Sequence, residues 1–302
     1  MLGNVPKPMA PVYGKPFLCY LFDRLAAAGV EHVVLATGYM HEVLLSYFGT
    51  QHNGMRVSYS QETQPLLTGG AILQAATYVS DDTFLVVNGD TLFDIDLRRF
   101  YAFHQSGSAP VSLALRQVDD VSRYGAVELE GGMARSFREK DACSGAGLIN
   151  GGVYAINRQW LLSQPLPRKF SFEKDLLLPQ AYSGTVRGMA FDNYFIDIGI
   201  PDDYQRAQKE FAALFPPARF LFLDRDGVLN KRIEGDYVRS WDSWQWLTGA
   251  AEKLSDWAGR FERIFIVSNQ QGVGKGLFTD DDLQAVHRNM LSDLQALGGR
   301  ID

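Results

Sequence analysis

The sequence has few cysteines and no long apolar run. Only Cys19 and Cys143 occur among its 302 residues. Two cysteines so far apart form neither a disulfide framework nor a zinc-binding spacing, which favours a reducing, cytoplasmic location. No apolar stretch reaches the ~20 residues that span a membrane. The first 15 residues are too rich in proline and glycine for a signal peptide, so we expect no membrane association.

Basic residues are also scarce. Lysine and arginine total 29 against 35 aspartates and glutamates, which gives a net charge of -6. Proteins that bind the phosphate backbone of a nucleic acid favour a basic face, so this balance argues against a nucleic-acid polymer as partner. The hydrophobic fraction of 46% is that of an ordinary soluble globular protein, and the length predicts two domains.

The first part of the chain alternates helical and strand-like segments. Residues 15–28 and 43–48 have helical patterns that end at a glycine, and residues 33–36, 56–60 and 84–87 have the apolar patterns of strands. This β-α-β-α-β order predicts a Rossmann-like α/β domain with helices on both faces of a mixed, mostly parallel sheet. After Pro110, short strand patterns predict a β-rich insertion; they cover residues 111–118, 124–129, 133–138 and 148–156.

A break in the pattern separates two predicted domains. Phe215-Pro216-Pro217 ends a helix that begins at Pro201, since proline cannot continue a helix. We therefore expect domains at residues 1–215 and 218–302. The second has two buried strands, 220–223 and 264–267, and helices at 249–258 and 280–297, which predicts a smaller α/β unit.

The second domain opens with a strand that runs into Asp224-Arg225-Asp226-Gly227. Residues two apart in a strand face the same way, and the carboxyl ends of strands bind ligands in open α/β sheets. Like charges ~4 Å apart repel by roughly 4 kcal/mol at an effective dielectric constant of about 20, so Asp224 and Asp226 need a cation or a shared proton. A solvated turn is the alternative. Ser268-Asn269-Gln270 follows the next buried strand and favours a phosphate site over that turn.

Four positions in the first domain combine polar or glycine residues with an element end. Lys7 lies in Pro6-Lys7-Pro8, a rigid, extended segment, or is simply a surface lysine. Gly69-Gly70 at a helix start allows close approach of a flat or anionic ligand, or only starts the helix. Asp90 follows a buried strand in Asn88-Gly89-Asp90, a run that also forms hairpin turns. Asp197 lies near another strand end.

Residues 1–215 resemble the sugar-1-phosphate nucleotidyltransferases, and most of all those that transfer a guanylyl group to heptose 1-phosphate. The resemblance depends on Pro6-Lys7-Pro8-Met9, residues 65–71, Asn88-Gly89-Asp90, Glu139-Lys140, Asn150-Gly151-Gly152 and residues 197–201. Residues 218–302 resemble the HAD phosphatases that remove the 7-phosphate of heptose 1,7-bisphosphate, through residues 224–228 and Ser268-Asn269-Gln270. Because these activities are successive steps in that family's pathway, the resemblance implies a bifunctional enzyme of nucleotide-activated heptose synthesis.

The resemblance implies roles for particular residues. In the transferase, Asp90 and Asp197 would hold Mg²⁺, and Lys7 would neutralise phosphate. The residues implied to contact nucleobase, ribose, sugar or sugar phosphate are Gly69, Gly70, Tyr124, Gly125, Glu139, Lys140, Asn150 and Glu173. In the phosphatase, Asp224 would be the nucleophile and Asp226 the general acid and base. Asp224 and Asp226 would bind Mg²⁺, and Ser268, Asn269 and Gln270 would bind the phosphoryl group. The implied substrates are a nucleoside triphosphate and a sugar phosphate.

The sequence also departs from both families. The transferases begin with a strand and a glycine-rich loop ahead of Pro-Lys-Pro, and they usually have glycine where Leu67 stands. The phosphatases continue to a later lysine and final aspartates. We therefore expect a chain truncated at both ends and of low activity. Mannose or glucose 1-phosphate, a histidinol-phosphatase-like second domain, or a non-catalytic scaffold remain alternatives, and homo-oligomerisation is left open.

Overall fold

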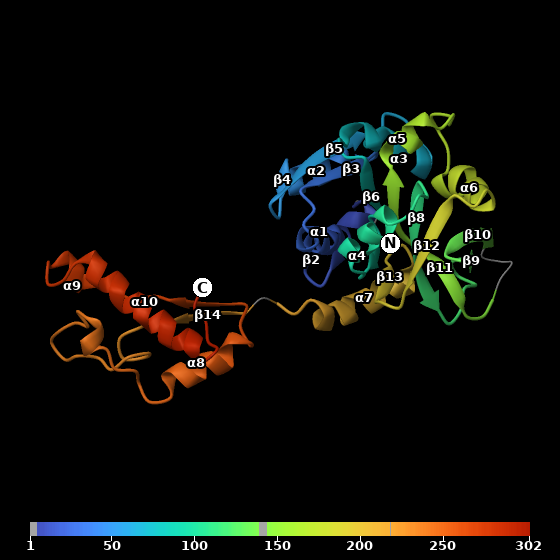
Figure 1. Cartoon of the computed structure of the whole chain (residues 1–302). Coiled ribbons are helices and arrows are strands. Elements are labelled where there is room, and N and C mark those ends of the chain that lie inside the picture. The colour runs from blue at the N-terminus through green and yellow to red at the C-terminus, as the bar shows by residue number, and fades with distance from the viewer. Residues whose placement is uncertain (1–4, 139–143, 218) are drawn as a thin grey trace. The chain divides into compact units, whose positions relative to one another are not determined.

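The computed structural model describes residues 5–138, 144–217 and 219–302. The chain divides into two compact units, Met1–Leu214 and Phe215–Asp302. The first unit is built on a six-stranded sheet, and the second on a two-stranded sheet (Figure 1).

The six strands of the large sheet follow the order β6-β11-β8-β12-β10-β9. They are β6 (Thr83–Val87), β8 (Val111–Val118), β9 (Ala126–Glu130), β10 (Met133–Arg138), β11 (Gly147–Asn157) and β12 (Val186–Phe191). Among the described strand pairs of this sheet, only β8 and β12 pair in parallel, and the other four pairs are antiparallel. The predicted mixed sheet is confirmed, but the predicted excess of parallel pairs is wrong. The reason is β11, which belongs to the predicted insertion yet runs back between β6 and β8.

Helices cover both faces of this sheet, as predicted. Alternation along β8 sends Leu113 to one hydrophobic cluster and Ala114 to another. The first cluster packs against α5 (Arg158–Ser163) and α6 (Leu178–Tyr182), and the second against α4 (Leu97–Gln105) and α1 (Phe17–Ala27) (Figure 1). Asp96 caps α4, because its carboxylate accepts the backbone N–H of Arg99.

A separate sheet contains the first predicted β-α-β unit. β3 (His32–Thr37) pairs in parallel with β5 (Met55–Gln61) across α2 (His41–Phe48), and β5 also pairs with β4 (Gln51–His52). Residues 33–36 and 84–87 were expected to be buried strands. Residues 33–35 and 84–87 are instead half-buried and Ala36 is exposed, and all of them line a cavity of about 1000 Å³. Within the described chain β3 and β6 each have one neighbouring strand, so one edge of each lies beside this cavity.

Short elements complete the first unit. They are η1 (Lys7–Met9), β1 (Pro11–Val12), β2 (Lys15–Pro16), α3 (Leu67–Ala75), η2 (Ala76–Tyr78), β7 (Thr91–Phe93), a π-helix η4 (Phe172–Leu177), β13 (Phe195–Asp197) and α7 (Pro201–Leu214). The segment around Lys7, predicted to be extended, forms a 3₁₀ turn in which Met9 N–H donates to Pro6 O. Proline fixes φ at a value that both an extended segment and a 3₁₀ turn can adopt, so the prolines alone could not exclude the turn.

In the second unit, β14 (Phe220–Leu223) pairs in parallel with β15 (Arg263–Ile266). The helices are η5 (Trp241–Ser243), α8 (Ala250–Ala258), α9 (Gln271–Gly274) and α10 (Asp280–Ala296). Leu221 and Leu223 pack into a core with Leu254, Ile264 and Leu294. Phe220 and Phe222 point the other way and are 50% and 64% exposed. The prediction of a buried strand is therefore wrong for this face, and the side chains of the inner face are half-buried. No helix in the described part of the chain is long and apolar enough to cross a membrane.

Candidate active sites

The clearest site in the first unit surrounds Gly199. β7 and β13 pair antiparallel with Thr91 opposite Asp197, and the N–H of Ile198 donates to Asp90 O at 2.9 Å. A Cβ placed on Gly199 would lie 2.9 Å from Asp197 Oδ1, 3.4 Å from Lys7 Nζ and 3.5 Å from Asp90 Oδ2. The structure therefore brings together three predicted site residues from three distant segments.

Sequence reasoning missed the ladder that forms this site. β7 is only three residues long and was not predicted, because so short a strand has no detectable apolar period. Gly199 was part of the family resemblance but had no assigned role. Its missing side chain leaves room between Lys7, Asp90 and Asp197, and its N–H donates to Asp197 Oδ1 at 2.8 Å.

The electrostatics at Gly199 suit a cation. Burial raises the pKa of Asp197, and the charge of Asp90 adds to that rise, whereas the Gly199 N–H and the Lys7 charge oppose it. Two close carboxylates, both half-buried, are hard oxygen ligands of the kind that Mg²⁺ takes together with water and substrate phosphates. Among the described residues there is no cluster of three or more histidine, cysteine or acidic ligands. The side chains present thus fit a Mg²⁺ ion that is shared with a phosphate.

Gly69 and Gly70 lie in the first turns of α3, against the segment that leads to Glu173. Both N–H groups donate to Phe170 O, at 3.0 and 3.3 Å. A Cβ on Gly69 would lie 2.2 Å from the Phe170 ring, and one on Gly70 would lie 2.3 Å from Arg168 O. In this structure the segment at residues 168–170, and not a ligand, lies close to the two glycines. The two glycines also lie at the start of a helix, as the alternative prediction stated.

Leu67, at the start of α3, has a left-handed backbone with φ of 60°. Few non-glycine residues adopt this conformation, because Cβ then crowds the backbone. A left-handed backbone at this position explains why a glycine would be favoured there. In this chain the backbone has that conformation although the residue is leucine.

Asn150, Tyr154 and Glu173 form a polar group at the bulge of β11. The β11–β8 register shifts between Asn150 and Val153, so β11 has a bulge at Gly151 and Gly152. Asn150 Nδ2 lies 2.8 Å from Tyr154 Oη and 2.8 Å from Glu173 Oε1. Glu173 is exposed and Tyr154 is buried, so the group leads from the core to the surface.

Tyr124 is linked to a residue that sequence reasoning missed. Its hydroxyl donates to Asp203 Oδ2 at 3.3 Å, and Asp203 is buried in the first turn of α7. Burial raises the pKa of Tyr124, and the charge of Asp203 adds to the rise. Gly125 is buried with φ of 83°, which favours glycine. Two other predicted sugar-site residues, Glu139 and Lys140, lie outside the described residues.

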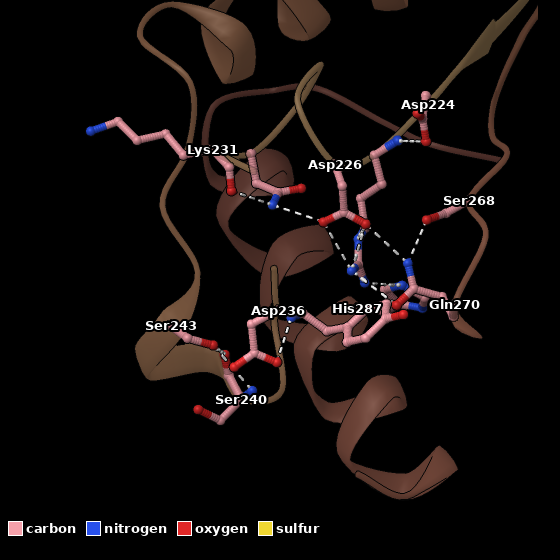
Figure 2. A network of polar contacts seen from close by, with 12 residues as sticks. Asp224, Asp226, Lys231, Asp236, Ser240, Ser243, Ser268, Gln270 and His287 are labelled. Atoms are coloured by element: carbon pink, nitrogen blue, oxygen red, sulfur yellow. Dashed lines mark hydrogen bonds and ion pairs between the residues drawn. The ribbon is translucent and has the colours of Figure 1, made fainter. Parts of the chain in front are cut away.

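The second unit has a polar network at the ends of its two strands (Figure 2). Asp224 follows β14 and Ser268 lies two residues beyond β15, and Val267 N–H donates to Leu223 O at 2.8 Å. Gln270 Nε2 donates to Ser268 Oγ and, at 3.1 Å, to Asp226 Oδ2. Asp224 and Asn269 are exposed. The predicted residues 268 and 270 are thus joined to Asp226.

Arg225 and Asn230, which sequence reasoning did not assign, hold Asp226 in place. Arg225 is fully buried and its Nη2 lies 3.0 Å from Asp226 Oδ2, while Asn230 Nδ2 donates to Oδ1 at 3.0 Å. Burial alone would raise the pKa of Asp226, but these hydrogen bonds, the Arg225 charge and Gln270 lower it below the usual range. Asp226 is therefore ionised at neutral pH, which suits a base better than an acid.

The nucleotidyl transferase family model matches residues 3–213, and the chain belongs to this family. The matched residues lie within the first unit.

Within that family, the first unit is of the D-glycero-D-manno-heptose 1-phosphate guanylyltransferase type. The chain is 44% identical over 210 residues to D-glycero-alpha-D-manno-heptose 1-phosphate guanylyltransferase of Aneurinibacillus thermoaerophilus, covering 70% of this chain and 91% of the relative. The enzyme of the same name from Campylobacter jejuni is 41% identical, with 68% and 90% covered. The crystal structure of HddC from Yersinia pseudotuberculosis superposes with a TM-score of 0.63 at 35% identity, over 70% of this chain and 92% of that one.

Proposed function

We propose that the chain transfers GMP from GTP to a heptose 1-phosphate and releases pyrophosphate. The observation that carries this proposal is the meeting of Asp90, Asp197 and Lys7 around Gly199. The names of the relatives support the choice of substrates, and one HddC structure is a complex with GMP-PN.

The proposed reaction is a displacement at phosphorus. A phosphate oxygen of the sugar phosphate attacks the α-phosphorus of GTP, and the bond from that phosphorus to the oxygen of the leaving pyrophosphate breaks. Such reactions depend on positioning and on neutralisation of charge. Asp90 and Asp197 would hold Mg²⁺, which when bound supplies positive charge to the phosphates. Lys7 adds a cation beside them, and Glu173 would receive hydroxyls of the sugar.

The loop at α3 would contact the nucleoside by packing. Because the N–H groups of Gly69 and Gly70 already donate to Phe170 O, they are not the donors that recognise the base. The exposed side chain of Leu67 and the turn around it offer an apolar surface instead.

The test is pyrophosphate release by the purified chain with GTP, Mg²⁺ and D-glycero-α-D-manno-heptose 1-phosphate. We expect release to need both substrates and to fall by about 10²–10³ in Asp90→Asn, since one preorganised charged group typically contributes that much. Asp192→Asn is the matched control, because that carboxylate is exposed and pairs with Arg116. Equal turnover in Asp90→Asn and wild type would contradict the metal assignment.

A substrate panel separates the alternatives. Mannose and glucose 1-phosphate, and the other nucleoside triphosphates, are assayed beside the proposed pair. If kcat/KM is higher with mannose or glucose 1-phosphate than with heptose 1-phosphate, that sugar phosphate is the substrate and the heptose assignment is wrong. Calorimetric binding of GTP and Mg²⁺ without turnover of any pair would favour a scaffold.

We further propose that the second unit hydrolyses a sugar bisphosphate. Asp224 and Ser268 follow adjacent parallel strands, and Gln270 links Ser268 to Asp226, which supports the proposal. Asp224 would attack the phosphorus as the P–O bond to the sugar breaks, and the leaving sugar oxygen would take a proton from water. Asp226 would then accept a proton from the water that attacks the aspartyl-phosphate, which releases phosphate and regenerates the Asp224 carboxylate.

Phosphate release from heptose 1,7-bisphosphate with Mg²⁺ tests this second proposal. Asp224→Asn is expected to abolish release, because an amide is not a nucleophile. Asp236→Asn is the control, since this exposed carboxylate pairs with Arg239. Faster phosphate release from histidinol phosphate would show that the heptose bisphosphate is not the preferred substrate. Phosphate release that persists in Asp224→Asn would show that Asp224 is not the nucleophile.

A further inference from the structure

The exposed carboxylate of Glu173 is connected to a buried hydroxyl. Glu173 lies in the first turn of the π-helix η4, and π-helical turns are frequent at functional sites. Within the described chain, the side-chain hydrogen bonds of Glu173 come from Asn150 and Tyr154. Tyr154 is only 3% exposed, and its ring packs edge-on against Phe172, with centroids 5.1 Å apart. The hydroxyl therefore has a fixed position beneath Glu173.

The amide of Asn150 is fully used by these contacts. Its Oδ1 accepts the N–H of Gly152 at 3.1 Å, which fixes the amide orientation. Its Nδ2 carries two protons, and they have two partners, Tyr154 Oη and Glu173 Oε1, each at 2.8 Å. In this arrangement Asn150 has no amide proton left for a ligand, so it acts on Glu173.

Tyr154 closes the triangle. Its oxygen accepts from Asn150, and its own proton is directed to Glu173 Oε1 at 3.5 Å. Burial raises the pKa of Tyr154, and the charge of Glu173 adds to the rise, so the hydroxyl keeps its proton and stays a donor at any working pH. Both contacts engage Glu173 Oε1, which leaves Oε2 as the oxygen that can accept from a ligand.

We propose that Tyr154 is a positioning residue for the sugar phosphate: with Asn150 it holds Glu173 Oε1, so that Oε2 is oriented towards the hydroxyls of the sugar. This inference rests on the proposed transferase function. It assigns to a buried hydroxyl a part in sugar specificity, and it gives Asn150 a supporting role in place of direct contact with the sugar.

Steady-state kinetics of Tyr154→Phe test the inference. This substitution removes one oxygen and keeps the ring against Phe172. We expect KM for the sugar 1-phosphate to rise about five- to tenfold, as for loss of one ordinary hydrogen bond, while KM for GTP and kcat stay within twofold. Tyr59→Phe is the matched control, because that hydroxyl donates to Gly49 O at 2.7 Å in another sheet.

A second variant, Asn150→Ala, breaks the same link from the other side. We expect a similar rise in KM, and in the double variant with Tyr154→Phe the two effects should not add, because both remove one link. Additive effects would show that Asn150 contacts the sugar itself, and would overturn the inference.

The remaining outcomes are distinct. An active wild type with unchanged sugar KM in Tyr154→Phe overturns the role of Tyr154 and leaves the transferase function standing. A general loss of kcat, of GTP binding and of thermal stability in Tyr154→Phe would show a structural role only, which also overturns it. Absence of turnover in wild type with every sugar phosphate overturns the proposed function, and this inference with it.

Discussion

At the scale of single residues, Gly199 defines the candidate transferase site by what it lacks. Lys7, Asp90 and Asp197 surround the space that a side chain there would fill. In the proposed reaction a cation and phosphate oxygens would occupy that space, which a larger residue would fill. The site is thus specified by one glycine as much as by the three charged residues.

Gly199→Ala should therefore impair catalysis more than folding. Its Cβ would lie 2.9 Å from Asp197 Oδ1, so the carboxylate must move. We expect kcat/KM for pyrophosphate release to fall at least about tenfold, because displacements near 1 Å cost up to roughly 10²-fold. Gly38→Ala is the control, since nothing lies within 4 Å of its Cβ position. Equal activity in the two variants would argue against a site at Gly199.

His104 makes the first unit sensitive to acid. Burial, and then the charge of Arg187, lowers the pKa of His104, whose Nδ1 lies 2.8 Å from Ser112 Oγ. The unfolded chain thus binds a proton at higher pH than the folded chain. Stability is fully present above the unfolded value of about 6.5 and is lost as the pH falls towards the lower folded pKa.

Urea denaturation between pH 7.5 and pH 5, read as the free energy of unfolding, measures this loss. We expect His104→Gln to reduce the fall in stability of the first unit over this range, because glutamine does not titrate. The same fall in wild type and variant would show that other groups cause it. The denaturation series covers this range because it extends at least about one pH unit above and below the ordinary histidine pKa of about 6.5.

At the scale of elements, local sequence signals indicate where a helix begins, whereas strand pairing depends on residues that are distant in the sequence. α7 begins at Pro201, a clear start signal, so its position was predicted from the sequence. The place of β11 could not be predicted, because its apolar pattern does not say which strands flank it. The pairing of β7 with β13 depends on residues about 100 positions apart, and so do the contacts around Gly199.

The same distinction holds for the candidate sites. Asp90 and Asp197 were identified individually because each stands near a strand end, and Lys7 because it lies in a rigid segment between two prolines. Asp203 and Tyr154 were missed, since a buried polar residue looks in sequence like any other member of its helix or strand. Their partners, Tyr124 and Asn150, are apparent only when the chain is folded.

The contact of α3 with segment 168–170 should be sensitive to added volume. In Gly70→Ala the Cβ would lie 2.3 Å from Arg168 O, a backbone atom that moves only with its segment. We expect a loss of about 1–3 kcal/mol in the free energy of unfolding, as for overpacked sites. Gly38→Ala should change stability by less than about 0.5 kcal/mol. Thermal and urea unfolding check both values, and equal stabilities would mean that segment 168–170 yields without cost.

At the scale of the whole molecule, the chain consists of two units, each with its own hydrophobic core. The family match lies in the first unit, and the proposed phosphatase residues lie in the second. Separate cores allow one unit to be perturbed while the other keeps its fold.

Leu294→Ala should separate the two proposed activities. Leu294 is fully buried in the core of the second unit, so truncation is expected to destabilise that unit by about 2–5 kcal/mol. Pyrophosphate release should keep its wild-type KM and kcat at temperatures where phosphate release is lost. Parallel loss of both activities would show that the first unit depends on the second.

The most direct test of the transferase assignment follows the α-phosphate of GTP. With GTP labelled at the α-phosphorus, heptose 1-phosphate and Mg²⁺, the chain is expected to place the label in a sugar nucleotide, and Asp90→Asn and Asp197→Asn to lose this product. Label that stays in GTP, or that appears in GMP or GDP without a sugar nucleotide, would contradict the assignment of nucleotidyl transfer to the site formed by Lys7, Asp90 and Asp197.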